Sequence, residues 1–146
     1  MSDKSLAVDA WEALFRAQVS VLRQLNAEFP TEQLSFNEYD VLFNLSRQPG
    51  RKLRLRDLNK HLLLTQPSVS RLVDRLVERE FVTKESDPGD GRGTVVCITE
   101  SGHELFRRVA VIHADSIHRR VGGALTAEEL TQLTALTDKL RLGSTA

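Results

Sequence analysis

The stretch that decides the fold runs from Leu62 to Arg79, LLLTQPSVSRLVDRLVER. Apolar residues recur in it at the i, i+3, i+4 and i+7 positions that form one buried face of a helix: Val69, Leu72, Val73 and Leu76. Thr65 or Gln66 can cap the start of this helix, and Pro67 fits its first turn, where a missing N–H costs nothing. The sequence therefore predicts an amphipathic helix that begins near residue 66.

The opposite face of this helix is polar, with Ser70 and Asp74 on its flank. It carries the following side chains: Ser68, Arg71, Arg75 and Glu78. Hydroxyl groups lie near the N-terminus and guanidinium groups further along, an arrangement that fits base edges and phosphates in a DNA major groove. A solvated surface helix shows the same pattern about as often. The neighbouring segments decide between these two interpretations.

The segments on both sides favour the DNA-binding interpretation. Residues 54–62, RLRDLNKHL, predict a short helix with its leucines on one side. A tight polar connector then joins the two helices into a helix-turn-helix. The second helix of such a motif contacts the bases and is called the reading helix here. Residues 81–85 and 94–99 are rich in β-forming residues and flank a loop rich in Gly, Asp and Pro. They predict a hairpin, or wing, with Arg92 near its tip.

Together these residues resemble the MarR (multiple antibiotic resistance regulator) family of winged-helix transcription factors. The resemblance covers residues 54–102, about a third of the chain. It rests on the SVSRLVDRLVER helix, the Asp87-x-x-Asp90-x-Arg92 wing and the Thr99-x-x-Gly102 step into the next helix. Each motif is weak alone, and the combination is specific. The resemblance also implies a very short strand at residues 52–54 that joins the wing as a third strand.

The resemblance implies a mainly α-helical fold with a small β-hairpin wing. We therefore expect a single winged helix-turn-helix domain over residues 1–146, with N- and C-terminal dimerisation helices at 5–34 and 100–146. The DNA-binding lobe would then span residues 35–99. Family members are obligate dimers whose first and last helices interleave, so a homodimer is expected here.

The N-terminal segments are amphipathic in the order that this layout requires. Residues 5–29 predict a long helix that ends before Pro30. Its apolar stripe is either a dimer seam, which the resemblance favours, or packing within one chain: Val8, Trp11, Phe15, Leu22, Leu25 and Phe29. Ser35 and Glu38 form a capping-box pattern that starts a second helix.

The C-terminal segments predict two more helices. Residues 100–121 form the first, which the Gly122-Gly123 pair breaks. Its inward-facing residues are expected to be Leu105, Phe106, Val109, Ile112, Ile117 and Val121. The last helix starts at a second capping box, made by Thr126 and Glu129, and ends near Gly143.

Composition is that of an ordinary globular protein, and its charge is distributed unevenly. The formal net charge is zero, from 20 Lys and Arg against 20 Asp and Glu. Residues 47–92 nevertheless hold eleven basic and seven acidic side chains, an excess of four that would orient the approach to DNA. One cysteine permits no intrachain disulfide, and neither a membrane span nor a signal peptide is evident. These features predict a cytoplasmic location.

The expected DNA contacts follow from the helix and the wing. We expect Ser68, Ser70, Arg71 and Arg75 to touch base edges or nearby phosphates, with Gln66 and Pro67 at the helix tip, where backbone N–H groups favour a phosphate. Arg92 is expected in the adjacent minor groove. Asp90 either holds Arg92 extended or simply favours the turn. A two-fold dimer would place its reading helices about 34 Å apart, so the operator should be an inverted repeat.

The resemblance also implies a switch, because family members commonly repress and release DNA when a small aromatic anion binds. Candidate pocket residues are Trp11, Phe15, Arg16 and Tyr39, although core packing explains the aromatic side chains equally well. Other members respond to cysteine oxidation or to a metal. Cys97 lies in the second wing strand and is expected to be a packed residue, and the four histidines show no i, i+4 metal pair. No cofactor is expected.

Two further functions fit the sequence less well than DNA binding does. No phosphate loop, nucleophile elbow or paired-histidine motif supports an enzyme. A winged helix that binds a protein partner is the stronger alternative, and it would present a more apolar face than the Ser and Arg face of this helix. The polar face therefore favours double-stranded DNA.

Overall fold

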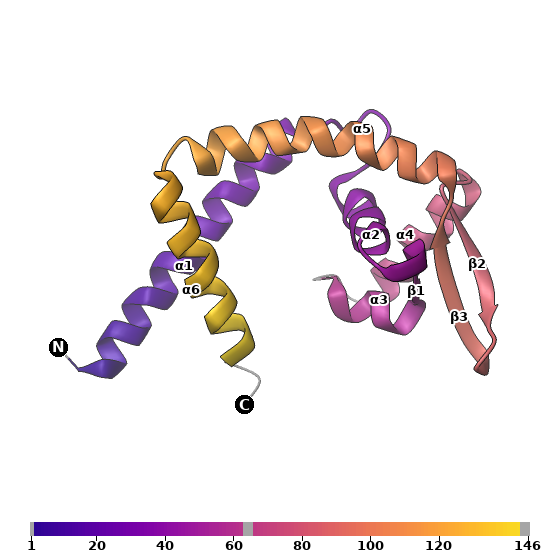
Figure 1. Cartoon of the computed structure of the whole chain (residues 1–146), viewed down its shortest axis with the longest axis horizontal. Helices are drawn as coiled ribbons and strands as arrows, with labels where there is room; N and C mark the ends of the chain where they lie inside the picture. The colour runs from indigo at the N-terminus through magenta and orange to yellow at the C-terminus, as the bar shows by residue number, and fades with distance from the viewer. Residues whose placement is uncertain (1, 63–65, 144–146) are drawn as a thin grey trace. The chain divides into compact units, whose positions relative to one another are not determined.

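The computed structural model describes residues 2–62 and 66–143, apart from the side chains of Gln66, Pro67 and Asp90. It divides into two compact units, residues 1–29 with 113–146, and residues 30–112. Of the predicted helix-turn-helix connector, residues 63–66, residues 63–65 with the candidate cap Thr65 lie outside the described residues. The helices and strands of Figure 1 are α1 (Asp3–Glu28), α2 (Phe36–Ser46), η1 (Pro49–Arg51), β1 (Lys52–Arg54), α3 (Leu55–His61), α4 (Gln66–Glu78), β2 (Val82–Asp87), β3 (Asp90–Ile98), α5 (Glu100–Ile117), η2 (His118–Gly122) and α6 (Ala127–Gly143).

The unit of residues 30–112 is a winged helix. Its helices α2, α3 and α4 contact a three-stranded antiparallel sheet of order β1-β3-β2. The four apolar residues predicted on one face of α4 are all buried, and the predicted short strand β1 pairs with β3. The fully buried side chains of this unit are Leu34, Val41, Leu42, Leu45, Leu58, Val69, Val73, Leu76, Val82, Val96 and Leu105. The predicted fold class is thereby confirmed.

The wing strands are longer than the sequence predicted. β2 continues to Asp87 and β3 begins at Asp90, so a two-residue turn replaces the expected long loop. The register shifts between Ser86 and Asp87, and the Asp87 side chain accepts a hydrogen bond from the Gly89 N–H at 2.9 Å. Aspartate commonly closes turns through its own downstream backbone in this way. The Pro and Gly residues that predicted a loop therefore shape a tight tip.

Helix α4 ends in a Schellman motif in which a non-glycine residue takes the left-handed position. The Phe81 N–H donates to the Leu76 carbonyl at 2.9 Å, and the Glu80 N–H donates to the Val77 carbonyl at 3.0 Å. Glu80 has φ 65°, a conformation that glycine adopts without the steric cost of a Cβ atom.

Replacing Glu80 with glycine is therefore expected to raise the free energy of unfolding by roughly 1 kcal/mol, because the left-handed strain disappears. Urea denaturation of the wild type, Glu80→Gly and Glu80→Ala measures the effect. The alanine variant removes the carboxylate but keeps the strain, so it should match the wild type. Equal stabilisation by both substitutions would assign the gain to charge and refute the conformational explanation.

The junction between the wing and α5 is built around one backbone carbonyl group, that of Phe81. The Phe81 carbonyl accepts a hydrogen bond from the Thr99 N–H at 3.0 Å. Thr99 also caps α5, because its Oγ1 accepts from the Gly102 N–H at 3.0 Å. A Cβ atom on Gly102 would lie 2.1 Å from the Phe81 carbonyl oxygen, so only glycine fits there. The Thr99-x-x-Gly102 motif is thus a packing requirement.

The inward face of α5 differs from the prediction. Leu105 and Val109 are buried as expected, but Ile112 and Ile117 are exposed. The buried positions instead continue through His113 and Ser116, because steps of four, four and three residues follow one helix face. His113 packs its ring against Phe29 at 5.3 Å between centroids, and burial lowers the pKa of this histidine. The prediction of the inward face from hydrophobicity alone was therefore wrong for Ile112 and Ile117.

The helix predicted for residues 100–121 changes to a π-helical turn at its end. A Cβ atom on Gly122 would lie 2.8 Å from His118 Nδ1, and one on Gly123 would lie 2.6 Å from the Arg119 carbonyl oxygen. The glycine pair therefore permits the wider turn, and the helical segment ends at this pair as the sequence predicted. Arg119 and Arg120 of this turn pair with Glu28 at 2.9 and 2.5 Å, and these hydrogen bonds lower the pKa of the Glu28 carboxyl.

The unit of residues 1–29 and 113–146 leaves much of its apolar surface in solvent. None of the residues Asp3–Glu28, all of which the structure describes, is buried. Of the stripe predicted on this helix, Phe29 is buried and Leu25 partly so. The large exposed apolar side chains of α1 and α6 are Leu6, Val8, Trp11, Phe15, Leu22, Leu133, Leu136, Leu140 and Leu142. Packing within one chain therefore does not account for the stripe.

Candidate nucleic-acid interface

Helix α4 presents the predicted polar face to solvent. Ser68, Arg71 and Arg75 are exposed, and Ser70 is partly buried. The four buried apolar residues of the helix fix which side faces outward. Within the described part of the chain, neither Arg71 nor Arg75 forms an ion pair. Their guanidinium groups are thus available to an anionic partner such as a phosphate.

The C-terminal end of α4 is anchored through Arg79. Its guanidinium lies 3.4 Å from the Glu38 carboxylate, donates to the Gln33 carbonyl and stacks over the Phe81 ring at 4.9 Å from the centroid. The other oxygen of Glu38 accepts from the Ser35 N–H at 2.8 Å in the predicted capping box. One carboxylate therefore ties the reading helix to the start of α2, which orients its polar face. The sequence prediction did not find this role, because Arg79 and Glu38 are 41 residues apart.

The wing lies beside α4 and is fastened at two points. Lys84 of β2 pairs with Asp74 of α4. At the tip, Asp87 Oδ2 lies 2.7 Å from Arg54 Nε, and the Asp87 side chain is 6% exposed. Arg54 is the residue at which β1 ends and α3 begins. Both ends of the wing are therefore held against the helix-turn-helix.

A basic hollow of about 300 Å³ lies between the reading helix, the β1–α3 junction and the wing. It brings together Ser70 of α4 and Arg92 of β3, two of the predicted site residues. Three arginines and one aspartate lie in its wall, and its lining residues are Arg54, Leu55, Arg56, Val69, Ser70, Asp87, Arg92, Gly93 and Thr94. Its cationic excess suits an anionic ligand such as a DNA backbone. The hollow does not include Ser68, Arg71 or Arg75, which lie elsewhere on α4.

Two members of this hollow were not assigned a role from the sequence. Arg54 and Arg56 counted only toward the basic excess, although their alternation with Leu53 and Leu55 was a signal that both point away from the core. The predicted contacts of Gln66, Pro67 and Asp90 lie outside the described side chains. Whether Asp90 holds Arg92 therefore stays a prediction.

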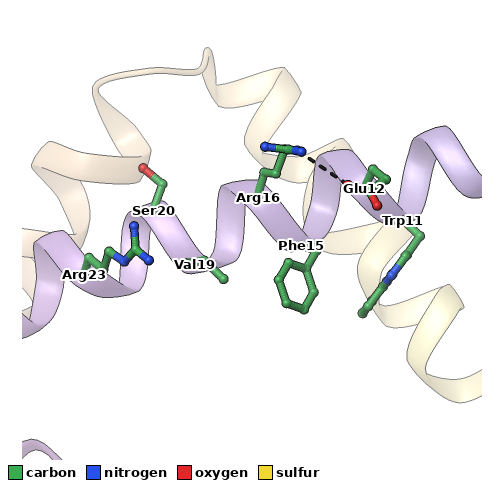
Figure 2. Close-up of a pocket in the computed structure, with 7 residues that line it drawn as sticks. All are labelled: Trp11, Glu12, Phe15, Arg16, Val19, Ser20 and Arg23. Atoms are coloured by element: carbon green, nitrogen blue, oxygen red, sulfur yellow. Dashed lines mark ion pairs between the residues drawn. The ribbon is translucent and has the colours of Figure 1, made fainter.

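The predicted pocket residues fall into two groups. Trp11, Phe15 and Arg16 line one hollow of about 500 Å³ along α1, with Glu12, Val19, Ser20 and Arg23. Figure 2 shows the Trp11 and Phe15 rings on one side of the helix, with 5.4 Å between their centroids, and Arg16 on the other, paired with Glu12 at 3.5 Å. Tyr39 belongs to the other unit, where its ring stacks on that of Phe106 at 5.2 Å. Burial raises the pKa of the Tyr39 hydroxyl.

Cys97 is partly buried in β3, opposite Lys52 on one side and Thr83 on the other. Burial, followed by the nearby Glu85 carboxylate, raises the pKa of its thiol. A thiol with a raised pKa is a poor nucleophile, because the thiolate is the reactive form. This environment fits the prediction of a packed strand residue. Among residues 2–62 and 66–143, no three or more His, Cys, Asp or Glu side chains form a cluster suited to a metal ion. In the same residues, no helix is long and apolar enough to cross a membrane.

Comparison with known proteins identifies the family to which this geometry belongs. A family model described as the MarR family matches residues 32–93. YkoM of Bacillus subtilis (strain 168), a helix-turn-helix-type transcriptional regulator, is 32% identical over 138 residues, which cover 94% of this chain and 88% of YkoM. The chain belongs to the MarR family. MhqR of Bacillus subtilis (strain 168), also such a regulator, is 26% identical and covers 99% of this MarR-family chain and 96% of its own length.

The structural comparison agrees over the whole length of the chain. The crystal structure of Sco3205, a MarR family transcriptional regulator from Streptomyces coelicolor in complex with DNA, matches with a TM-score of 0.80 and 26% identity. The match covers 98% of this chain and 89% of Sco3205. This MarR-family protein is therefore a winged helix-turn-helix transcriptional regulator, which confirms the function class predicted from the sequence.

Proposed function

We propose that this MarR-family regulator is a homodimeric repressor that binds an inverted-repeat operator and leaves it when a small aromatic anion binds. The observation that carries the DNA-binding part is the outward polar face of α4 beside a wing arginine. Ser68, Ser70, Arg71 and Arg75 would contact base edges and phosphates in the major groove, and Arg92 would enter the neighbouring minor groove. Gln66 and Pro67 would meet a phosphate at the helix tip, with Asp90 orienting Arg92.

Three further points support this DNA-binding role. Sco3205, whose crystal structure is of a complex with DNA, shares the fold along the whole chain. The face of α4 is polar, whereas a helix that docked on a protein partner would present an apolar anchor at its centre. A repressor needs no further surface, because an occupied operator blocks polymerase sterically. Such a protein would act where the chromosome lies, in the cytoplasm.

The homodimer is supported by the exposed apolar side chains of α1 and α6. Trp11 is 57% exposed and Leu136 65% exposed, and large apolar side chains left in solvent in such number mark an interface. Several leucines on α6 at helical spacing would leave water when a second copy packs there. Each buried side chain of this size contributes about 1.5–3 kcal/mol to association.

Replacing Leu136 with glutamate is expected to convert the dimer into a monomer and to abolish DNA binding. In a lone chain this side chain lies in solvent, so the substitution harms the protein only if a second copy covers it. Sedimentation equilibrium and a mobility-shift titration, using a duplex selected from a random-sequence pool, measure the two effects. Gln132→Glu adds the same charge on the same helix at a polar position and should leave both unchanged. A Leu136→Glu variant that stays dimeric and binds DNA would refute this interface.

The effector site is supported by the aromatic and cationic lining of the α1 hollow. A volume of about 500 Å³ suits a small organic molecule. The lining includes the Trp11 and Phe15 rings and, on the other side of α1, the Arg16 guanidinium (Figure 2), which together offer the two kinds of group that an aromatic carboxylate needs. The hollow is open along one helix, so a second copy of the chain would have to enclose it. Tyr39 is a further candidate for the effector site, although it is not among the residues that line this hollow.

Arg16→Ala is expected to bind the selected duplex as the wild type does but to lose release by aromatic acids. The reason is that Arg16 would neutralise the bound carboxylate, while it takes no part in reading DNA. A panel of small aromatic carboxylates, titrated into the protein–DNA complex, measures release by fluorescence anisotropy of labelled DNA. Arg108→Ala, which removes an exposed arginine from α5, is the control. If aromatic acids release DNA from Arg16→Ala at the same concentrations as from the wild type, Arg16 is not part of the effector site.

A further inference from the structure

The wing tip contains a buried carboxylate, whose negative charge does not suit a contact with DNA. Asp87 ends β2 at the register shift, and its side chain is 6% exposed. Each of its oxygens has a different partner: Oδ1 accepts from the Gly89 N–H at 2.9 Å, and Oδ2 lies 2.7 Å from Arg54 Nε. The carboxylate therefore joins the turn of the wing to the β1–α3 junction.

The distal part of the wing needs such a tie. Strand β1 pairs with β3 only from Lys52 opposite Cys97 to Arg54 opposite Val95. Beyond Val95 toward the tip, β3 is paired only with β2, and this pairing is irregular at Asp87. Arg92 lies in that distal part between two glycines, which are the most permissive residues for the backbone. A two-stranded ribbon of this kind is only marginally rigid by itself.

Electrostatics gives no other reason for a negative charge at this place. The Asp87 carboxylate lines the same hollow as Arg54, Arg56 and Arg92, so it reduces the attraction of that hollow for phosphate. A partly exposed ion pair contributes little stability, because solvent screens it and side-chain entropy opposes it. A role in positioning the wing therefore explains the presence of the Asp87 carboxylate, which otherwise lowers the affinity for DNA.

We propose that Asp87 is a positioning residue: its pairing with Arg54 fixes the distance between the distal wing, which carries Arg92, and Ser70 on the reading helix. This inference rests on the proposed function, because it concerns how the wing engages DNA. The pair sets the position at which Arg92 enters the minor groove. Asp87 itself contacts no DNA.

Asp87→Asn tests the proposal because charge and geometry predict effects of opposite sign. Asparagine keeps the size and the oxygen that accepts from Gly89, but it loses the ion pair with Arg54. If charge alone mattered, removing a carboxylate from a DNA-binding surface would tighten binding. The proposal predicts roughly tenfold weaker binding of the selected duplex, comparable to the loss of one arginine contact. Glu85→Gln removes the same charge from an exposed position of the same strand and should bind as tightly as the wild type or more tightly.

The partner residue supplies a second test that does not depend on how well Asp87→Asn folds. Arg54→Gln lies at a partly exposed position and breaks the pair from the other end. The two substitutions should not be additive, so the double variant should bind about as weakly as either single variant. A direct phosphate contact by Arg54 would instead make the double variant weaker than both. Both variants should also lose the preference for A·T over G·C pairs beside the half-site, as Arg92→Ala would, and keep the half-site itself.

The outcomes separate this inference from the function on which it rests. Weaker binding by Asp87→Asn, non-additivity with Arg54→Gln and loss of flank preference support it. If the wild type binds specifically while Asp87→Asn binds as tightly as Glu85→Gln, the positioning role is wrong and the proposed function stands. If the wild type binds no duplex, the proposed function itself fails. Thermal melting of each variant fixes the temperature at which all are folded for the binding measurements.

Discussion

Gly102→Ala is expected to lower the free energy of unfolding by about 3 kcal/mol or more. The new Cβ atom would lie 2.1 Å from the Phe81 carbonyl oxygen, inside the distance that real Cβ atoms keep. That oxygen cannot move freely, because it accepts the Thr99 N–H at 3.0 Å. The gain in helix propensity from glycine to alanine is at most about 1 kcal/mol, so the clash decides the sign.

Gly143→Ala is the matched control for this substitution. Gly143 is also a helical glycine, at the end of α6, and a Cβ atom there would have nothing within 4 Å among the described residues. The control should be neutral or slightly stabilising. Urea denaturation followed by circular dichroism compares the two variants with the wild type. Equal stability of Gly102→Ala and Gly143→Ala would show that the junction between the wing and α5 does not close around Phe81.

Arg71→Ala and Arg75→Ala are each expected to weaken specific DNA binding by about 5- to 150-fold while the fold and the dimer persist. Both side chains are exposed on the polar face of α4, so their loss removes no packing. A good arginine–base contact contributes about 1–3 kcal/mol of discrimination, which corresponds to this range. Where an arginine contacts only phosphate, binding should weaken equally for all sequences and the salt dependence should become shallower.

Titration of selected and scrambled duplexes at several salt concentrations measures both effects. Arg108→Ala removes the same charge from α5 and should change specific binding little, because α5 is not the reading helix. Wild-type affinity for both Arg71→Ala and Arg75→Ala would show that another surface reads the DNA. Lower affinity of Arg108→Ala to the same degree would attribute the losses to net charge.

Elements with a strong local signal were predictable from the sequence. The four apolar residues of α4 appear at helical spacing and are all buried, since a helix beside a sheet must bury one face. The Ser35–Glu38 and Thr126–Glu129 capping boxes form as predicted, because both partners lie within one helical turn. Local chemistry determines these features, so no tertiary information was needed.

Features that depend on distant partners were not predictable. Glu38 and Arg79 appear on separate helices as ordinary surface charges, and only the fold brings them together. Asp87 looked like a turn former, and its pairing with Arg54 depends on the position of β1 beside the wing. His113 and Ser116 continue the buried face of α5 where isoleucines were expected, because helix geometry outweighs side-chain hydrophobicity. The left-handed Glu80 is likewise imposed by the junction with β2.

Selection of duplex DNA by the purified protein, followed by sedimentation of the resulting complex, tests the proposal of two matching helices in successive major grooves. We predict a selected motif that is an inverted repeat with half-site centres about 10 base pairs apart, bound by two chains. Affinity for it should fall steeply as salt rises, since bound phosphates release their counterions. A single asymmetric site bound by one chain, or no enrichment of any sequence at low salt, would contradict the proposal.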